Sequence, residues 1–232
     1  MPSVLITGAN RGLGLEFVSQ LALDHFRVHA CCRDPKKADA LNALAAEHPE
    51  LISVHRMDVT DDADIAAVAK ELADAPIDIL INNAGIYGPE TAQRLGDIDY
   101  DGWRRVLETN VLSPMKVTRA LLPNVKKSKR KIIAVLSSQM GSIGQNESGG
   151  HYIYRSSKAA VNAVFKSLSV DLREEEVTVV MLHPGWVKTD MGGPRAPLTA
   201  DAVVGGMLTL LENLDFQDSG RFLTWEEEEL PW

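Results

Sequence analysis

The chain has 232 residues and a mass of 25.4 kDa, which suits one large hydrophobic core but not two ordinary domains with a linker. Its 45% hydrophobic and 24% charged residues exclude a disordered or fibrous class. A net charge of −8 gives no broad attraction to nucleic acid or anionic lipid, and no apolar run reaches the roughly 20 residues that span a bilayer. We therefore expect one domain over residues 1–232, with neither nucleic acid nor a membrane as partner.

The amino-terminal residues and the cysteines indicate the compartment. Met1 leads directly into a strand-like run, without the basic and cleavage segments of a signal peptide. Cys31 and Cys32 are adjacent within an apolar run, an arrangement that suits neither a disulfide framework nor a metal site. We expect a cytoplasmic protein with two buried thiols and no bound metal.

Short β-branched runs alternate with longer stretches of helical period along the chain. The predicted strands are residues 4–7, 27–32, 52–57, 77–82, 131–137, 177–183 and 221–224. The predicted helices include residues 12–23, 36–47, 64–72, 159–172 and 203–211, and loops are expected at 141–150 and 192–197. Continuous apolar strands are typical of a parallel sheet covered on both faces. The sequence therefore predicts an α/β fold: a single-domain, doubly wound Rossmann fold with about seven parallel strands and helices on both faces.

A glycine-rich turn lies between the first predicted strand and the first helix. Gly8 permits a tight turn, Gly12 lets the backbone approach a pyrophosphate, and Gly14 lets the helix pack closely on the strand. The helix amides that follow favour an anion. This position in an open parallel sheet predicts a dinucleotide-binding turn.

The end of the second strand bears on the choice of nicotinamide cofactor. No acid occupies the Cys32 position to accept hydrogen bonds from the 2′-hydroxyl of NAD, whereas Arg33 and Arg11 offer cations for the 2′-phosphate of NADP. NADP(H) is the predicted cofactor. In the alternative, Arg33 pairs with Asp34 or solvent, and Asp34 competes for the NAD contact.

Tyr154 and Lys158 lie four residues apart at the start of a helical stretch, so they share one helix face. A nearby ammonium group lowers the pKa of a phenol by about 1 to 3 units, which would prepare Tyr154 as a general acid and base. Tyr152 has no lysine four residues later and is the weaker choice.

Several motifs occur in one order between residues 7 and 189: T-G-x-x-x-G-x-G at 7–14, Asp58-Val59, N-N-A-G at 82–85, Asn110, Ser138, Y-x-x-x-K at 154–158 and Pro184-Gly185. In this order they resemble the short-chain dehydrogenase/reductase family. The longer gap between Ser138 and Tyr154 and the short segment 191–198 are similar to its carbonyl-reductase-like branch, which includes the sniffer and C-factor proteins. A short segment at 191–198 implies an open cleft without a helical lid.

The resemblance implies a catalytic set of Asn110, Ser138, Tyr154 and Lys158. Ser138 would orient the carbonyl group, Lys158 would hydrogen-bond the nicotinamide ribose, and Asn110 would hold a water in a proton relay. Ser137 would point to the other side of its strand.

The resemblance also implies how the cofactor lies. Asp58 would contact the adenine, Ala84 and Gly85 the adenosine ribose, and the loop 184–189 the nicotinamide half. The full set of expected cofactor contacts is Gly8, Asn10, Arg11, Gly12, Leu13, Gly14, Arg33, Asp58, Val59, Asn83, Ala84, Gly85, Tyr154, Lys158, Pro184, Gly185, Val187 and Thr189.

The function that these features predict is NADPH-dependent reduction of a ketone or aldehyde to an alcohol, with Tyr154 as general acid and base. Two alternatives remain: an NADP-dependent alcohol dehydrogenase acting oxidatively, and an NADP(H)-binding regulatory or signalling protein with little turnover. The partner is a small carbonyl or alcohol substrate, and the family resemblance implies a homodimer or homotetramer.

Overall fold

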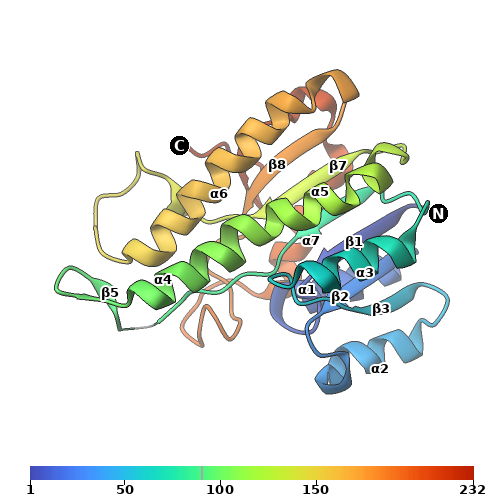
Figure 1. Ribbon diagram of the computed structural model, residues 1–232, viewed down its shortest axis with the longest axis horizontal. Coiled ribbons are helices and arrows are strands. Elements are labelled where there is room, and N and C mark those ends of the chain that lie inside the picture. Colours follow the sequence, from blue (N-terminus) through green and yellow to red (C-terminus); the bar gives the residue numbers. More distant parts are fainter. Residues whose placement is uncertain (90) are drawn as a thin grey trace.

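The computed structural model describes residues 1–89 and 91–232 and is built around a sheet of seven parallel strands (Figure 1). The strands are β1 (Ser3–Thr7), β2 (Arg27–Cys32), β3 (Ile52–Arg56), β4 (Ile79–Asn82), β7 (Ile132–Leu136), β8 (Thr178–His183) and β9 (Phe222–Thr224). Their order in space is β3-β2-β1-β4-β7-β8-β9. The chain winds outward from β1 to β3, returns to β4 and winds outward in the other direction, which is the predicted doubly wound fold.

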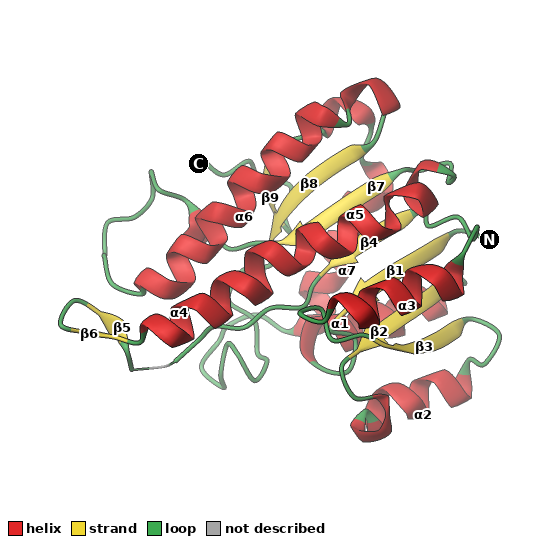
Figure 2. Ribbon diagram, viewed as in Figure 1, coloured by secondary structure: helices red, strands yellow, loops and turns green. Residues whose placement is uncertain are grey.

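Helices cover both faces of the sheet (Figure 2). One layer contains α1 (Gly12–Leu23), α2 (Asp39–Glu47) and α7 (Ala200–Asn213), and the other contains α3 (Asp62–Leu72), α5 (Ser113–Lys126) and α6 (Tyr152–Asp171). The helix α4 (Tyr100–Leu107) runs through a π-helical segment, η2 (Glu108–Leu112), into α5. Two covered faces explain why the strands read as continuous apolar runs.

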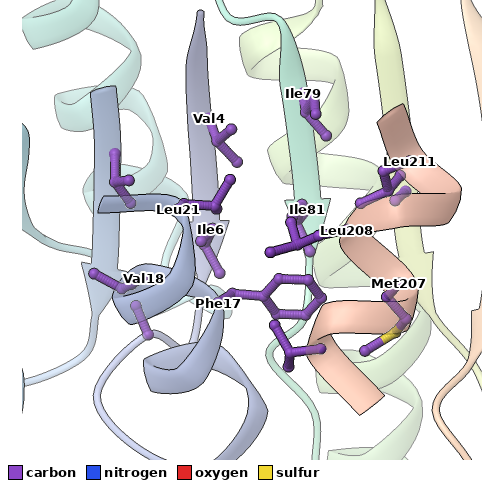
Figure 3. Packing of buried hydrophobic residues seen from close by; sticks show 14 of the residues in the cluster. Val4, Ile6, Phe17, Val18, Leu21, Ile79, Ile81, Met207, Leu208 and Leu211 are labelled. Carbon is purple, nitrogen blue, oxygen red and sulfur yellow. The ribbon is translucent and has the colours of Figure 1, made fainter. Parts of the chain in front are cut away.

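The alternation of side chains along β1 divides the core into two layers. Val4 and Ile6 pack with Phe17 and Met207 on the α1 and α7 side (Figure 3). Leu5 packs on the opposite side with the α5 and α6 cluster. Each of these side chains is fully buried, and burial of one large apolar side chain contributes roughly 1.5–3 kcal/mol. The two layers therefore fix the sheet rigidly beneath the loops at its edge.

The structure differs from the sequence prediction at several element ends. The predicted helix 36–47 is a 3-10 turn, η1 (Pro35–Lys37), followed by α2, because Ala38 between them has a non-helical ψ of 56°. The helix α6, predicted over residues 159–172, begins earlier, at Tyr152, so Tyr154 lies within its first turn. A short antiparallel hairpin, β5 (Gln93–Arg94) and β6 (Asp97–Ile98), was not predicted from the sequence. Within the described residues, no helix is both long and apolar enough to cross a membrane.

Candidate active site

The glycine-rich turn follows β1 at the point where the sheet reverses its winding direction. Gly8 and Gly12 have φ angles of +68° and +55°, in the region that favours glycine. A Cβ atom on Gly14 would lie 2.2 Å from the carbonyl oxygen of Gly8. The Asn83 side chain donates to the carbonyl oxygens of Thr7, at 2.7 Å, and Gly8, at 3.2 Å. The turn is thus held by the residue that follows β4, and α1 begins there without a side-chain cap, which suits an anion.

A groove of about 840 Å³ passes over this turn. The predicted cofactor residues that line it are Gly8, Asn10, Arg11, Gly12, Leu13, Gly14, Arg33, Asp58, Val59, Asn83, Ala84, Gly85, Tyr154, Lys158, Pro184 and Thr189. Two predicted contacts lie outside this lining, Gly185 and Val187. The Val187 side chain is buried in the core and its backbone bridges to Leu198, so only its main chain is suited to contact a ligand.

Two basic side chains, Arg33 and Lys37, line the end of the groove beyond β2. Asp34 forms an ion pair with Lys37, at 3.0 Å, rather than with Arg33. Burial alone would raise the pKa of Asp58, but its hydrogen bonds to Thr60 and the charge of Arg33 hold that pKa below its ordinary value. Lys37 was missed from the sequence, although the basic pair that follows the second strand was a signal for it. Arg33 and Lys37 together make this end suited to a phosphate.

Arg11, the other cation predicted for the 2′-phosphate, forms an ion pair with the loop after β8. Its guanidinium group donates to the Asp190 carboxylate at 2.6 Å, and both side chains are mostly exposed. The Asp190 loop lies close to the turn, because a Cβ on Gly12 would be 3.5 Å from the Thr189 methyl group. An exposed ion pair contributes only about 0–1 kcal/mol, so a phosphate group can compete for Arg11.

The loop after β8 is held by a neutral histidine. His183 Nδ1 accepts a hydrogen bond from the Gly185 amide at 3.3 Å, and burial lowers the pKa of His183 to about 4. The chain then continues to α7 without a helix in this described segment, as the expected open cleft requires. The backbone of Trp225 bonds the His183 carbonyl oxygen, and its ring packs against the core.

Tyr154 and Lys158 lie on α6 and line the other end of the groove, and Ser138, which follows β7, lies outside that lining but interacts with Tyr154. The ammonium group of Lys158 donates to the carbonyl oxygen of Leu136 at 2.8 Å and lies 5.6 Å from the centroid of the Tyr154 ring. The Ser138 hydroxyl oxygen accepts from the Met140 amide at 3.2 Å, which caps a short 3-10 turn. Ser138, Tyr154 and Lys158, three of the four catalytic candidates, are buried and are brought together from α6 and the segment after β7.

The predicted lowering of the Tyr154 pKa by Lys158 is wrong for this structure. Burial raises the pKa of Tyr154 to about 12, while interaction with Ser138 opposes the rise. Burial also lowers the pKa of Lys158 to about 8. Desolvation outweighs the charge that sequence spacing alone suggested. Tyr154 is therefore a protonated phenol at neutral pH and can act directly as a proton donor.

Asn110 lies in the π-helical segment η2, and its side chain is fully engaged. Its Oδ1 accepts from the Ile86 amide at 2.9 Å, and its Nδ2 donates to the Ile86 carbonyl oxygen and the Ser157 hydroxyl. A Cβ on Gly85 would lie 3.3 Å from this Oδ1 and 3.8 Å from Lys158 Nζ. The structure gives the Asn110 side chain a structural role that joins the segment after β4 to α6, and the water relay stays a prediction.

Two further residues lie near the candidate site: Ser137, the weaker alternative to Ser138, and Tyr87. The Ser137 hydroxyl donates to Asn162 on α6 at 2.6 Å in a buried contact, although Ser137 itself also lines the groove. Tyr87 was missed, although it follows the N-N-A-G motif closely. Its ring lies 4.7 Å from the Tyr154 ring, and its hydroxyl lies 2.7 Å from His151 Nδ1. Tyr87 therefore belongs to the surroundings of Tyr154.

Comparison with known proteins gives a consistent assignment. The model of the short chain dehydrogenase family matches residues 2–198. The C-signal of Myxococcus xanthus is 46% identical over 72% of this chain and 99% of its own length. A Rhodococcus 1-hydroxy-2-glutathionyl-2-methyl-3-butene dehydrogenase is 32% identical over the full length of both proteins.

Solved structures agree with this assignment over the whole chain. The carbonyl reductase Sniffer of D. melanogaster has a TM-score of 0.92 at 35% identity and covers 100% of both chains. An NADPH-bound carbonyl reductase from chicken fatty liver has a TM-score of 0.93 at 39% identity, covering 100% of this chain and 99% of its own. The chain is an oxidoreductase that belongs to the short-chain dehydrogenase/reductase family, in its carbonyl-reductase-like branch.

Proposed function

We propose that this protein reduces a ketone or aldehyde to an alcohol with NADPH, and that Tyr154 supplies the proton. The observation that supports this most is the layout of the groove, with Arg33 and Lys37 at one end and Tyr154 and Lys158 at the other, where Ser138 interacts with Tyr154. Such a groove joins a phosphate-binding end to a buried proton donor.

The residues present fit a dinucleotide. Gly8 and Gly12 form the turn with positive φ angles, Gly14 lets α1 pack closely against Gly8, and the turn presents the uncapped start of α1. Arg33 and Lys37 are cations that favour a 2′-phosphate. Lys37 also forms an ion pair with Asp34, the carboxylate that would otherwise accept a hydrogen bond from a 2′-hydroxyl. When bound, the nicotinamide supplies hydride to the substrate carbon.

The side chains of the cluster then divide the proton chemistry. The Ser138 hydroxyl donates to the carbonyl oxygen and fixes its position beside the phenol. Tyr154, protonated because of its raised pKa, gives its proton to that oxygen as negative charge develops there. The charged form of Lys158 stabilises the phenolate that remains, in a buried setting where electrostatic interactions are strong. Burial of the cluster excludes bulk water from the reacting groups.

Two observations keep other readings as second candidates. The Rhodococcus relative is named as a dehydrogenase of an alcohol, which favours the oxidative direction with the same residues acting in reverse. The relative named C-signal favours a signalling role with little turnover. Turnover rates with NADPH and NADP⁺ separate these candidates.

The test is NADPH consumption across a panel of ketones, aldehydes and quinones, with NADH and the Tyr154→Phe variant measured alongside. The proposal expects turnover that prefers NADPH and falls by roughly 10²–10⁴-fold in Tyr154→Phe, the range of general acid catalysis. Tight NADPH binding without turnover on any compound would instead favour the signalling candidate, and faster alcohol oxidation would favour the dehydrogenase.

A further inference from the structure

Gln93 joins the segment after β4 to the catalytic helix. It lies on the short strand β5, and its side chain is 1% exposed. Its amide nitrogen donates to the carbonyl oxygens of Tyr87, at 3.2 Å, and Pro89, at 2.8 Å. Its amide oxygen accepts from the backbone N–H of Tyr154 at 3.0 Å. One buried amide therefore binds both a loop and the backbone of the catalytic tyrosine.

The bond to Tyr154 supplies a cap that α6 lacks locally. The first N–H groups of a helix have no partner within the helix, and Tyr154 is the third residue of α6. His151, the residue before α6, makes no side-chain cap and has a left-handed φ of 51°. Gln93, 61 residues away in the sequence, takes this role. The start of the catalytic helix thus depends on a distant side chain.

The loop that Gln93 holds also contacts the Tyr154 ring. Tyr87 packs against that ring with a centroid distance of 4.7 Å, and its hydroxyl is paired with His151 at the helix start. Tyr87 and Pro89 line a second cavity of about 410 Å³, which shares Gly85 with the cofactor groove. The backbone and the ring of Tyr154 are therefore both located by this one loop.

We propose that Gln93 is a positioning residue for the reaction, which fixes the phenol of Tyr154 relative to Ser138 by capping the first turn of α6 and holding the loop 87–89. The inference rests on the proposed function. Gln93 touches neither reacting atoms nor cofactor, so its loss affects the chemical step through geometry. Misplacement of a catalytic group by about 1 Å can cost on the order of 10²-fold in rate.

The test is Gln93→Met, which keeps the length and apolar volume of the side chain but removes all three hydrogen bonds. The matched control is Asn124→Leu in α5. Asn124 is 3% exposed, and its amide likewise donates to two loop carbonyl oxygens, those of Ala73 and Ala75, at 3.0 and 2.8 Å. The backbone carbonyl oxygen of Asn124, which the substitution leaves in place, accepts from the Ile77 amide just before β4 begins, at the opposite end of that strand from the site.

In Gln93→Met we expect kcat to fall by at least about tenfold, while the Kd for NADPH stays within about twofold of the wild-type value. Asn124→Leu is expected to lower the urea midpoint as much as Gln93→Met does but to keep kcat within about twofold. Wild-type kcat in Gln93→Met, or an equal loss of kcat in the Asn124→Leu control, would overturn the inference.

Hydrogen exchange gives a readout that does not depend on turnover. In Gln93→Met the Tyr154 amide should exchange faster than in the wild type, whereas Asn124→Leu should leave its exchange unchanged. Unchanged protection of Tyr154 in Gln93→Met overturns the inference even if no carbonyl substrate is found. Absence of wild-type turnover together with faster exchange of Tyr154 in Gln93→Met would count against the proposed function alone.

Discussion

Titration of Lys158 sets the alkaline limit of the proposed reaction. Burial lowers the pKa of this lysine from an ordinary 10.5 to about 8. At roughly 1.4 kcal/mol per pKa unit, the structure favours the neutral amine by about 3 kcal/mol more than water does. About nine-tenths of Lys158 is then charged at pH 7 and about one-tenth at pH 9. Because the charged form stabilises the phenolate of Tyr154, carbonyl reduction should weaken as pH rises.

The assay is kcat/KM for carbonyl reduction between pH 6 and 10, with saturating NADPH. We expect a constant value below about pH 7.5 and a fall of about tenfold per pH unit well above 8. Lys158→Met should be slower throughout and lose this fall. The Tyr154 phenol, with a pKa of about 12, contributes no titration in this range. A wild-type value that stays constant to pH 9.5 would refute the reasoning, as would a Lys158 pKa near 10.5 measured by NMR.

Three further predictions test the groove and the fold. Arg33→Ala should weaken NADPH binding by about 10- to 100-fold, since charge-assisted hydrogen bonds contribute about 1.5–3 kcal/mol, and should leave NADH binding nearly unchanged. Equal losses of affinity for both cofactors in fluorescence titration would contradict a contact between Arg33 and the 2′-phosphate. Gly14→Ala should abolish NADPH binding, because its Cβ would lie 2.2 Å from the Gly8 carbonyl oxygen. The control Gly205→Ala in α7 should bind NADPH normally, because its Cβ would lie 3.5 Å from the nearest side-chain atom. Tight NADPH binding by Gly14→Ala would show that the turn is not the site. The pKa of buried His29 is lowered to about 4, so as pH falls below about 6.5 the unfolded chain binds a proton at this residue before the folded protein does. At pH 5 this difference should lower the free energy of unfolding by about 2 kcal/mol. Urea unfolding of the wild type and of His29→Asn measures the effect, and equal pH dependence in both would disprove the assignment.

The parts of the site that sequence predicts are those set by local geometry. Gly8 and Gly12 could be predicted because a positive φ angle favours glycine at that one position, whatever packs around it. Tyr154 and Lys158 share a helix face because of their spacing, wherever the helix lies. The strands were predicted because burial on both sides leaves a continuous apolar run, and the seven-stranded parallel sheet is confirmed.

The parts that sequence did not predict depend on what packs against a residue. Gln93 gives no local sign that it caps a helix 61 residues away. Asp190 could not be paired with Arg11 before the loop was placed over the turn. The pKa of Tyr154 was predicted in the wrong direction because spacing reveals a neighbouring charge but not the depth of burial. Burial is a property of the assembled layers, and it decides the chemistry here.

Transfer of deuterium from NADPH that carries deuterium at both hydrogen positions of nicotinamide C4 tests the central claim most directly. The wild type, incubated with a carbonyl compound that it consumes, should place one deuterium on the carbinol carbon of the alcohol, as detected by mass spectrometry. Tyr154→Phe should bind the labelled cofactor with similar affinity and form almost no labelled alcohol. Unlabelled alcohol from the wild type, or equal label from Tyr154→Phe, would contradict hydride transfer from NADPH with Tyr154 as the proton donor.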